Sequence, residues 1–292
     1  MSGHAGLLHV QGAGPKLAYE IVRPPGASAS NAPLTLLCLH GNSSHRGIWR
    51  PVAYGLADAG FPGLLLDLRG HGDSDHVVPP AYDPPDHAAD IVQVVMALGL
   101  TRYAILGHSN GALVAARFIT AAGRFPTVPP PVAFIWVDLD PLVPRGQVAY
   151  FRERADSVGR VFPTVEDVLV GFQRMYPNVS ADVLRTFIAE GLRPVEGGWR
   201  MKLDPATFAT WEPGDLRPEL TRITCPTLVL RGAASLVSSP EGLADLQRRL
   251  PRWEVREIPG GSHLLLLEYP EGVAKAIREF LRGKAVGQGM PS

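Results

Sequence analysis

A serine stands at the centre of the pentapeptide Gly107-His108-Ser109-Asn110-Gly111. The apolar run at residues 103–106 predicts a buried strand before it, and the apolar residues 112–121 predict a helix after it. In this strand-turn-helix context a G-x-S-x-G sequence exposes a serine hydroxyl for nucleophilic attack. The flanking glycines let strand and helix approach without Cβ clashes. Ser109 is therefore the predicted nucleophile.

A serine hydroxyl is a weak nucleophile at neutral pH, so it needs a base and a third group that orients the base. Nine histidines compete for the role of base. His263 lies in a loop between a predicted strand at residues 253–258 and the last predicted helix, at residues 272–281. His40 and His108 flank the predicted nucleophile, and we expect them to shape the site.

Short apolar runs bounded by glycine, proline or charge predict strands that are buried on both faces. They lie at residues 34–39, 63–66, 103–106, 133–137 and 227–230. Between them, residues 86–98 have helical spacing of apolar positions, with Asp86 as the predicted N-cap. Residues 7–10 and 16–22, separated by a short glycine turn, predict an antiparallel start. Strands that alternate with helices indicate a mostly parallel sheet covered on both faces.

The alternation stops between residues 141 and 216, where no buried-strand run occurs and amphipathic helices follow one another. Thr164 and Ser180 are placed to cap two of these helices. We therefore predict a core domain made of residues 1–140 and 217–292. Residues 141–216 are predicted to form an inserted helical cap.

Over nearly its whole length the sequence resembles the α/β-hydrolase family. Besides the pentapeptide around Ser109, it has His40-Gly41-Asn42-Ser43-Ser44 after the third predicted strand and Asp67-Leu68-Arg69-Gly70-His71-Gly72-Asp73-Ser74 after the fourth. The resemblance implies an α/β fold with a mostly parallel eight-stranded sheet, flanking helices and an inserted helical cap. It also implies that His263, at the place of the family's catalytic histidine, is the base.

The same resemblance places an oxyanion hole beside the nucleophile. The backbone N–H of Asn42 is expected to donate one hydrogen bond to the oxyanion. Asn110, the residue after the nucleophile, is expected to give the second from the first turn of its helix, where free N–H groups and the helix dipole favour negative charge. The side chain of Asn110 need not take part.

The orienting acid is where the sequence departs from the family pattern. The family usually carries Asp or Glu just after the strand that is here predicted at residues 227–230. The following loop, residues 231–239, contains no carboxylate, and Ser235 or Leu236 stands at the expected position. Neither side chain can stabilise an imidazolium as an anion does.

Two aspartates follow the strand predicted at residues 133–137. Asp138 comes directly after it and should emerge at the C-terminal edge of the sheet, where open α/β folds gather their active sites. Some members of the family carry their acid at the end of this strand. We predict Asp138 as the acid, with Asp140 as the fallback. The alternative is that these aspartates only pack or cap the loop and that a functional acid is absent.

The composition of the chain argues against nucleic acid and membranes as binding partners. The 28 Lys and Arg residues balance the 28 Asp and Glu residues, which removes the positive field that nucleic acid or an anionic membrane surface selects. No apolar run approaches the roughly 20 residues needed to span a bilayer. Residues 1–14 lack the pattern of a secretory signal. We expect a cytoplasmic protein that binds no nucleic acid and no membrane.

One group of charged residues raises the question of a metal. His71, Asp73, Asp75 and His76 lie close together in the sequence, but their spacing matches no metal-ligand pattern. We interpret them as paired charges on a glycine turn. No metal and no other cofactor is predicted.

The predicted activity is hydrolysis of carboxylic esters through an acyl-enzyme on Ser109, with a small-molecule ester as substrate. Aromatic side chains in the predicted cap indicate an apolar acyl or alcohol group, unless they merely pack the cap. They are Tyr150, Phe151, Phe162, Phe172, Tyr176 and Trp199. Thioesters, lactones and carbon-carbon bonds stay open as substrates, and no pattern predicts the oligomeric state.

The loop without a carboxylate motivates an alternative function. The chain would then be a non-hydrolytic member of the family, either a cofactor-free oxygenase or lyase that uses the Ser-His pair, or a small-molecule receptor.

Overall fold

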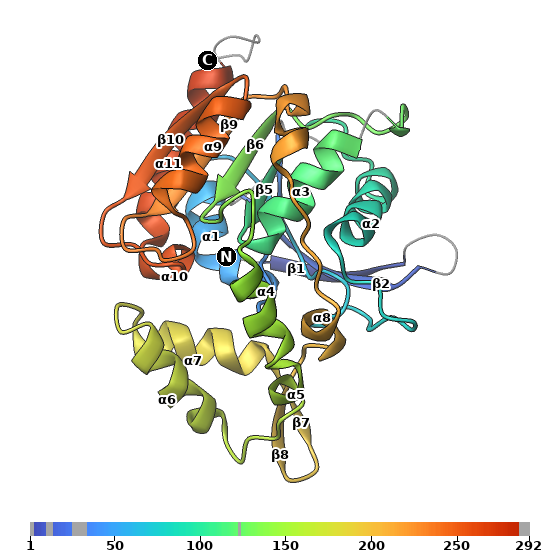
Figure 1. The fold of residues 1–292 in the computed structure, drawn as a ribbon, viewed down its shortest axis with the longest axis vertical. Helices are drawn as coiled ribbons and strands as arrows, with labels where there is room; N and C mark the ends of the chain where they lie inside the picture. Colours follow the sequence, from blue (N-terminus) through green and yellow to red (C-terminus); the bar gives the residue numbers. More distant parts are fainter. Residues whose placement is uncertain (1–2, 10–13, 25–33, 122–123, 286–292) are drawn as a thin grey trace.

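A computed structural model of the chain describes residues 3–9, 14–24, 34–121 and 124–285. At its centre is an eight-stranded sheet with the strand order β1-β2-β4-β3-β5-β6-β9-β10 (Figure 1). The strands are β1 Gly3–His9, β2 Lys16–Val22, β3 Thr35–Leu39, β4 Gly63–Leu66, β5 Tyr103–His108, β6 Ala133–Val137, β9 Thr227–Gly232 and β10 Trp253–Ile258. β2 is antiparallel to β1 and β4, and the other neighbours run parallel. The predicted mostly parallel sheet with an antiparallel start is confirmed.

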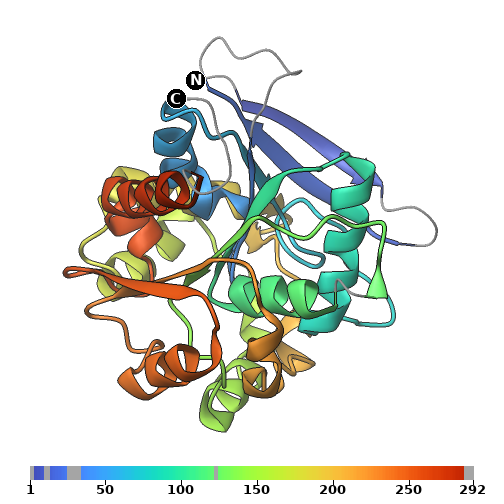
Figure 2. The same cartoon turned by 90° about the horizontal axis from the view of Figure 1, so that it is seen from above.

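The strands direct alternate side chains into two hydrophobic cores, one on each face of the sheet. In β3, Leu36 and Cys38 belong to one core, while Leu37 and Leu39 belong to the other. Helices cover both faces, as Figure 2 shows from above. On the first face lie α1 (Arg50–Asp58), α10 (Leu265–Glu268) and α11 (Pro270–Ala285), and on the second α2 (Pro84–Ala97), α3 (Asn110–Ala121) and α9 (Pro240–Arg249). The predicted fold class is therefore confirmed.

The start of α2 differs from the prediction. Asp83 is the N-cap, and Asp86 is the third residue of the helix, where the two side chains form a capping box. The prediction of Asp86 as N-cap was wrong, because the helix already begins at Pro84 and includes Pro85. Proline is favoured in the first turn, where its missing N–H removes no intrahelical hydrogen bond.

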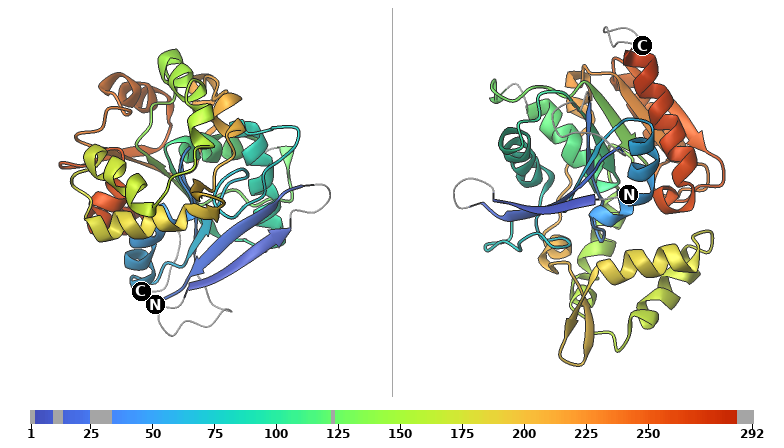
Figure 3. Two further views of the ribbon diagram at one scale, coloured as in Figure 1. Left: turned by 90° about the horizontal axis from the view of Figure 1, so that it is seen from below. Right: turned by 180° about the vertical axis from the view of Figure 1, so that it is seen from behind.

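Most of the chain between β6 and β9 gathers at one end of the molecule (Figures 1 and 3). That part contains α4 Arg145–Arg152, α5 Ala155–Val158, α6 Val165–Met175, α7 Ala181–Glu190, the strands β7 Leu192–Val195 and β8 Gly198–Met201, and α8 Ala206–Ala209. The 3₁₀ helix η3 Arg217–Arg222 follows and contacts α3 and α9 instead. Thr164 and Ser180 are the N-caps of α6 and α7, as predicted. Besides these helices, β7 and β8 form an antiparallel hairpin, which the sequence analysis did not predict.

The hairpin escaped detection because its strands are half-exposed and carry no buried apolar run. The division into a core and a cap at residues 141–216 stays a prediction. Residues 1–2 and 286–292 of the predicted core, residues 10–13 and 25–33 near its start and residues 122–123 lie outside the described part of the chain.

Candidate active site

Ser109 lies on a tight turn between β5 and α3. Its φ angle is 53°, in the left-handed region that costs free energy for a residue with a side chain. The Ser109 N–H donates to the carbonyl of Val137 at 2.9 Å, which fixes the turn against the end of β6. A Cβ atom at Gly107 would lie 2.3 Å from the carbonyl oxygen of Gly111, so the strand and helix can approach only with glycine at this position. The side chain of Ser109 is half-buried.

The loop after β3 packs directly on this turn. A Cβ atom at Gly41 would lie 2.7 Å from the Cβ atom of Ser109, so Gly41 and the adjoining Asn42 lie beside the predicted nucleophile. His40 anchors the loop: its Nε2 accepts from the N–H of Leu68 at 3.0 Å, and its Nδ1–H therefore donates to the carbonyl of Gly41 at 2.8 Å. Burial lowers the pKa of His40 to about 3, so the ring is neutral. The loop is thus held in one position.

Asn110, the second expected oxyanion donor, is the first residue of α3. The N–H groups of the first helical turn have no intrahelical acceptor, which leaves them free for an anion. The side chain of Asn110 is buried, and its Oδ1 accepts from Trp211 Nε1 at 3.1 Å. This side chain therefore ties the start of α3 to the chain near α8.

Asp138 emerges from the end of β6 and contacts His263. Its Oδ2 lies 2.8 Å from His263 Nδ1, and the aspartate side chain is fully buried while the histidine side chain is 24% exposed. Oδ1 accepts from the N–H of Gly232 at 2.9 Å, and Oδ2 also accepts from the hydroxyl of Ser235 at 2.6 Å. Burial alone would raise the pKa of Asp138, but the partnership with His263, Ser235 and Gly232 lowers it below the ordinary value. The carboxylate is therefore ionised at neutral pH.

Asp140 lies two residues further on and has different partners. Its Oδ1 accepts from the N–H of Ser239 at 2.9 Å, and its Oδ2 accepts from the hydroxyl of Ser239 at 2.6 Å. Burial raises its pKa, against the effect of these hydrogen bonds. The structure brings Asp138 to His263 and places Asp140 at the N-terminus of α9.

His108 connects the serine turn to the histidine loop. Its Nε2–H donates to the carbonyl of His263 at 2.8 Å, and the two rings lie 4.7 Å apart between centroids. Burial lowers the pKa of His108 to about 3, so it lies beside His263 as a neutral ring. Within the described part of the chain no hydrogen bond joins the Ser109 hydroxyl to His263. Such bonds are often long in unliganded enzymes and tighten only around the substrate.

Sequence reasoning missed two of these contacts. It assigned no specific partner to His108, although a histidine inside the pentapeptide is the signal from which its place could have been found. It noted Ser235 only as the residue where a carboxylate was expected, and nothing in the sequence showed that its hydroxyl reaches Asp138.

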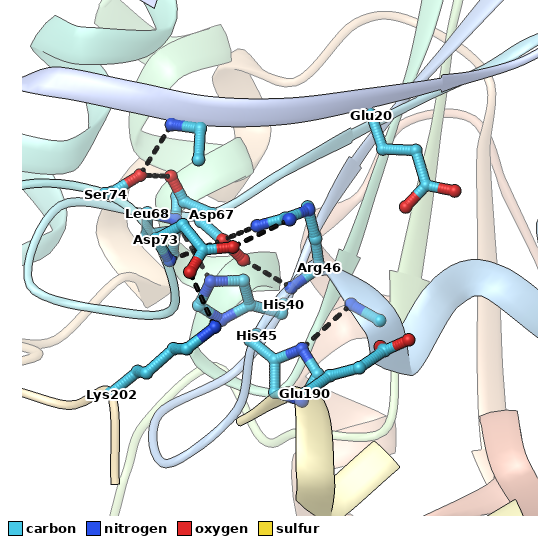
Figure 4. Close-up of polar contacts among 12 residues, drawn as sticks. Glu20, His40, His45, Arg46, Asp67, Leu68, Asp73, Ser74, Glu190 and Lys202 are labelled. Carbon is cyan, nitrogen blue, oxygen red and sulfur yellow. Dashed lines mark hydrogen bonds and ion pairs between the residues drawn. The ribbon is translucent and has the colours of Figure 1, made fainter. Parts of the chain in front are cut away.

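Charged side chains lie close to the loop after β3 (Figure 4). Arg46 forms an ion pair with Asp67 and a second with Asp73, whose Oδ2 lies 2.8 Å from Arg46 Nη2. Lys202, just after β8, lies 2.7 Å from Asp73. The interpretation of Asp73 as one of several paired charges therefore agrees with its contacts. In the described residues no group of three or more His, Cys, Asp or Glu side chains is arranged to hold a metal ion.

His45 and Arg50 make further contacts between the same loop region and α7. His45 Nδ1 accepts from the N–H of Gly47 at 3.2 Å, and its Nε2–H donates to the carbonyl of Phe187 at 2.9 Å. Arg50 pairs with Glu190 at the end of α7. These bonds join the chain between β6 and β9 to the loop that carries Asn42.

A small cavity lies between this loop and α6, α7 and β8. Most of its lining side chains are apolar, and Ser43 and Ser44 of the loop after β3 also line it. Of the aromatic residues predicted to line a cleft, Phe172 lines this cavity. Phe151 instead packs edge-on against Phe208 and Trp211.

Comparison with known proteins shows the family of the chain. The model of the alpha/beta hydrolase family matches residues 36–276. The chain belongs to the alpha/beta hydrolase family. This hydrolase is 30% identical to 2-(acetamidomethylene)succinate hydrolase of Mesorhizobium japonicum, over 84% of its own length and 87% of the relative's. It is 25% identical to Esterase Rv0045c of Mycobacterium tuberculosis, over 92% of its own length and 90% of the relative's.

The fold of this alpha/beta hydrolase is also that of solved relatives. The crystal structure of E-2-(acetamidomethylene)succinate hydrolase matches it with a TM-score of 0.80 and 27% identity, covering 96% of this chain and 100% of that chain. The names of these relatives support hydrolytic activity on a small-molecule substrate. Among the described residues, no helix combines the length and apolar character needed to cross a membrane.

Proposed function

We propose that the chain is a serine hydrolase that cleaves carboxylic esters through an acyl-enzyme on Ser109. His263 is the base, and Asp138, displaced to the end of β6, is the acid that orients it. The observation that carries this proposal is the 2.8 Å contact between His263 Nδ1 and a fully buried Asp138 carboxylate. The left-handed turn that exposes Ser109 beside the same sheet edge supports it further.

The hydrogen bond to Asp138 sets the direction of proton transfer. Because the carboxylate only accepts, His263 donates through Nδ1–H and keeps Nε2 free to accept the Ser109 proton. The serine oxygen then attacks the ester carbonyl, and the oxyanion is stabilised by the N–H groups of Asn42 and Asn110. The protonated His263 passes its proton to the leaving alcohol, and the same base activates a water that hydrolyses the acyl-enzyme. The products are a carboxylic acid and an alcohol.

The substrate we propose has an apolar acyl or alcohol group. The mostly apolar cavity beside Ser43 and Ser44 supports this choice, since these residues directly follow Asn42. Residues 141–216 act in this proposal as a cap that supplies the walls from α6, α7 and β8.

The first test is steady-state hydrolysis of p-nitrophenyl acetate and p-nitrophenyl butyrate. Replacement of the nucleophile, Ser109→Ala, is expected to lower kcat by about 10⁶-fold, the order seen when a serine hydrolase loses its nucleophile. Ser157→Ala, at an exposed position of α5, is the matched control and should leave kcat unchanged. Wild-type activity that survives in Ser109→Ala would rule out the proposed acyl-enzyme.

A second candidate substrate comes from the relative at 30% identity, which is named for hydrolysis of 2-(acetamidomethylene)succinate. The same residues would attack its acetamide carbonyl. Release of acetate from this compound by wild type, lost in Ser109→Ala, would favour this substrate over simple esters. Absence of turnover with both substrate classes would favour the non-hydrolytic alternative.

A further inference from the structure

The loop that follows β9 holds the carboxylate of Asp138 from two sides. The N–H of Gly232 donates to Oδ1 at 2.9 Å, and the hydroxyl of Ser235 donates to Oδ2 at 2.6 Å. The Ser235 oxygen itself accepts from the N–H of Val237 at 3.2 Å. Because one side of the hydroxyl oxygen faces a donor, its own proton is directed at the carboxylate. The Ser235 hydroxyl therefore donates to the ionised carboxylate of Asp138 in a single orientation.

The same loop also contacts the segment that carries His263. The N–H of Ala234 donates to the carbonyl of Gly261 at 2.8 Å, and a Cβ atom at Gly232 would lie 2.3 Å from that carbonyl oxygen. The loop thus contacts Asp138 and the segment that leads into His263. A displacement of this loop would change the distance and the angle between Asp138 and His263.

We propose that Ser235 is a positioning residue for the displaced acid: it fixes the carboxylate of Asp138 in the rotamer that meets His263. This inference rests on the proposed catalytic roles of Asp138 and His263. Ser235 and His263 bind the same oxygen, Oδ2, while Gly232 binds the other. Three donors at defined positions leave the carboxylate one orientation, and removal of the Ser235 donor frees it to rotate. The carboxylate comes from the end of β6, and the hydroxyl that holds it comes from the loop after the neighbouring strand β9.

The loop offers a matched control. Ser239 donates its hydroxyl to Asp140 at 2.6 Å, the same kind of bond at the same length, but Asp140 does not touch His263. Ser235→Ala should lower kcat about 10- to 100-fold, which is the fold-change that corresponds to loss of a hydrogen bond to a charged group, with KM within about twofold. Ser235→Thr keeps the hydroxyl and should recover most of kcat. Ser239→Ala should stay within about twofold of the wild-type kcat.

These outcomes separate positioning from mere structural support. A wild-type kcat in Ser235→Ala, equal losses in Ser235→Ala and Ser239→Ala, or no recovery in Ser235→Thr would each overturn the inference. Thermal unfolding of each variant shows whether it is folded, and Ser235→Thr keeps the test decisive if Ser235→Ala is not. Activity that is lost in Ser109→Ala but kept in Ser235→Ala would contradict this inference alone, whereas activity kept in Ser109→Ala would contradict the proposed function.

A transfer of the carboxylate is the most demanding test. Asp138 has a φ angle of 54°, which glycine tolerates, so Asp138→Gly removes the acid and leaves space beside His263. Adding Ser235→Asp to this variant places a carboxylate on the loop that already reaches the same oxygen position. The kcat of the double variant should be at least about 10-fold higher than that of Asp138→Gly. This gain would recover only a small part of the loss of about 10⁴-fold that removal of the acid causes. Equal kcat values for the two would show that position 235 does not reach His263 and would overturn the inference.

Discussion

Two aspartates at the end of β6 each bind a serine of the same loop but differ in burial and in their other partners. Asp138 and Asp140 each accept a serine hydroxyl at 2.6 Å from the loop after β9. Asp138 also meets His263, and its pKa is lowered, whereas burial raises the pKa of Asp140, which meets only Ser239 and the backbone there. Both accept a serine hydroxyl, so the contact with His263 and the deeper burial of Asp138 distinguish the proposed catalytic carboxylate from Asp140.

The largest expected effect is the loss of kcat in the variant Asp138→Asn. Asp138→Asn keeps the shape of the side chain, and asparagine tolerates the left-handed backbone found here. It should lower kcat for p-nitrophenyl butyrate about 10⁴-fold, because His263 loses the charge that stabilises its protonated form. Asp140→Asn is the control and should stay within about threefold of wild type in the same steady-state assay. Similar losses in both variants would remove the distinction between the two carboxylates.

The pH dependence of stability should have opposite signs for the two aspartates. Asp138 has a lowered pKa in the folded state, so its ionised form stabilises the fold above the unfolded pKa, and this contribution is lost as the pH falls through the lowered value. The free energy of unfolding of wild type minus that of Asp138→Asn should therefore shrink between about pH 6 and about pH 3. The raised pKa of Asp140 means that its ionised form opposes folding, so the corresponding difference for Asp140→Asn should grow.

Urea unfolding of the three proteins at both pH values measures these differences directly. Matching slopes for the two variants would contradict the assignment of different roles. Because each variant is compared with wild type at the same pH, titration of groups that do not contact the substituted aspartate cancels to first order.

The smallest expected effect is a loss of stability in Ser239→Ala, with no loss of catalytic activity. Ser239 is the N-cap of α9, and its hydroxyl accepts from the N–H of Gly242 while it donates to Asp140. Ser239→Ala should lower the free energy of unfolding by about 1–2 kcal/mol, as loss of a helix cap does. Urea unfolding measures this loss, and steady-state kinetics should show kcat within about twofold of wild type. A large fall in kcat would show that the Asp140 side of the loop also supports His263.

The sheet was predictable from the sequence because its strands are buried on both faces. The apolar runs at residues 63–66 and 133–137 coincide with β4 and β6, since glycine, proline or charge bounds them. Half-exposed elements carry a weaker signal, so β7 and β8 were missed, although Gly197 and Gly198 at their turn are typical of a hairpin. The N-terminus of α2 was misplaced by three residues, because both acids of a capping box resemble an N-cap.

The candidate site was predictable in its order along the chain and not in its contacts. The serine motif and the loop position of His263 are local features of the sequence. The choice of Asp138 over Asp140 rested on its position directly after the strand. The hydrogen bonds of Ser235 and His108 depend on loop conformations that bring together residues about 97 and 155 positions apart, and no periodicity encodes such a meeting.

The most direct test of the central claim is covalent labelling with a fluorophosphonate, followed by mass spectrometry. The serine oxygen displaces fluoride from phosphorus, so the labelling rate reports how strongly His263 and its acid activate the nucleophile. We predict a single adduct on the peptide that contains Ser109, formed about 10⁴-fold more slowly in Asp138→Asn and at the wild-type rate in Asp140→Asn. An adduct on another residue, or equal labelling rates in Asp138→Asn and wild type, would contradict the account.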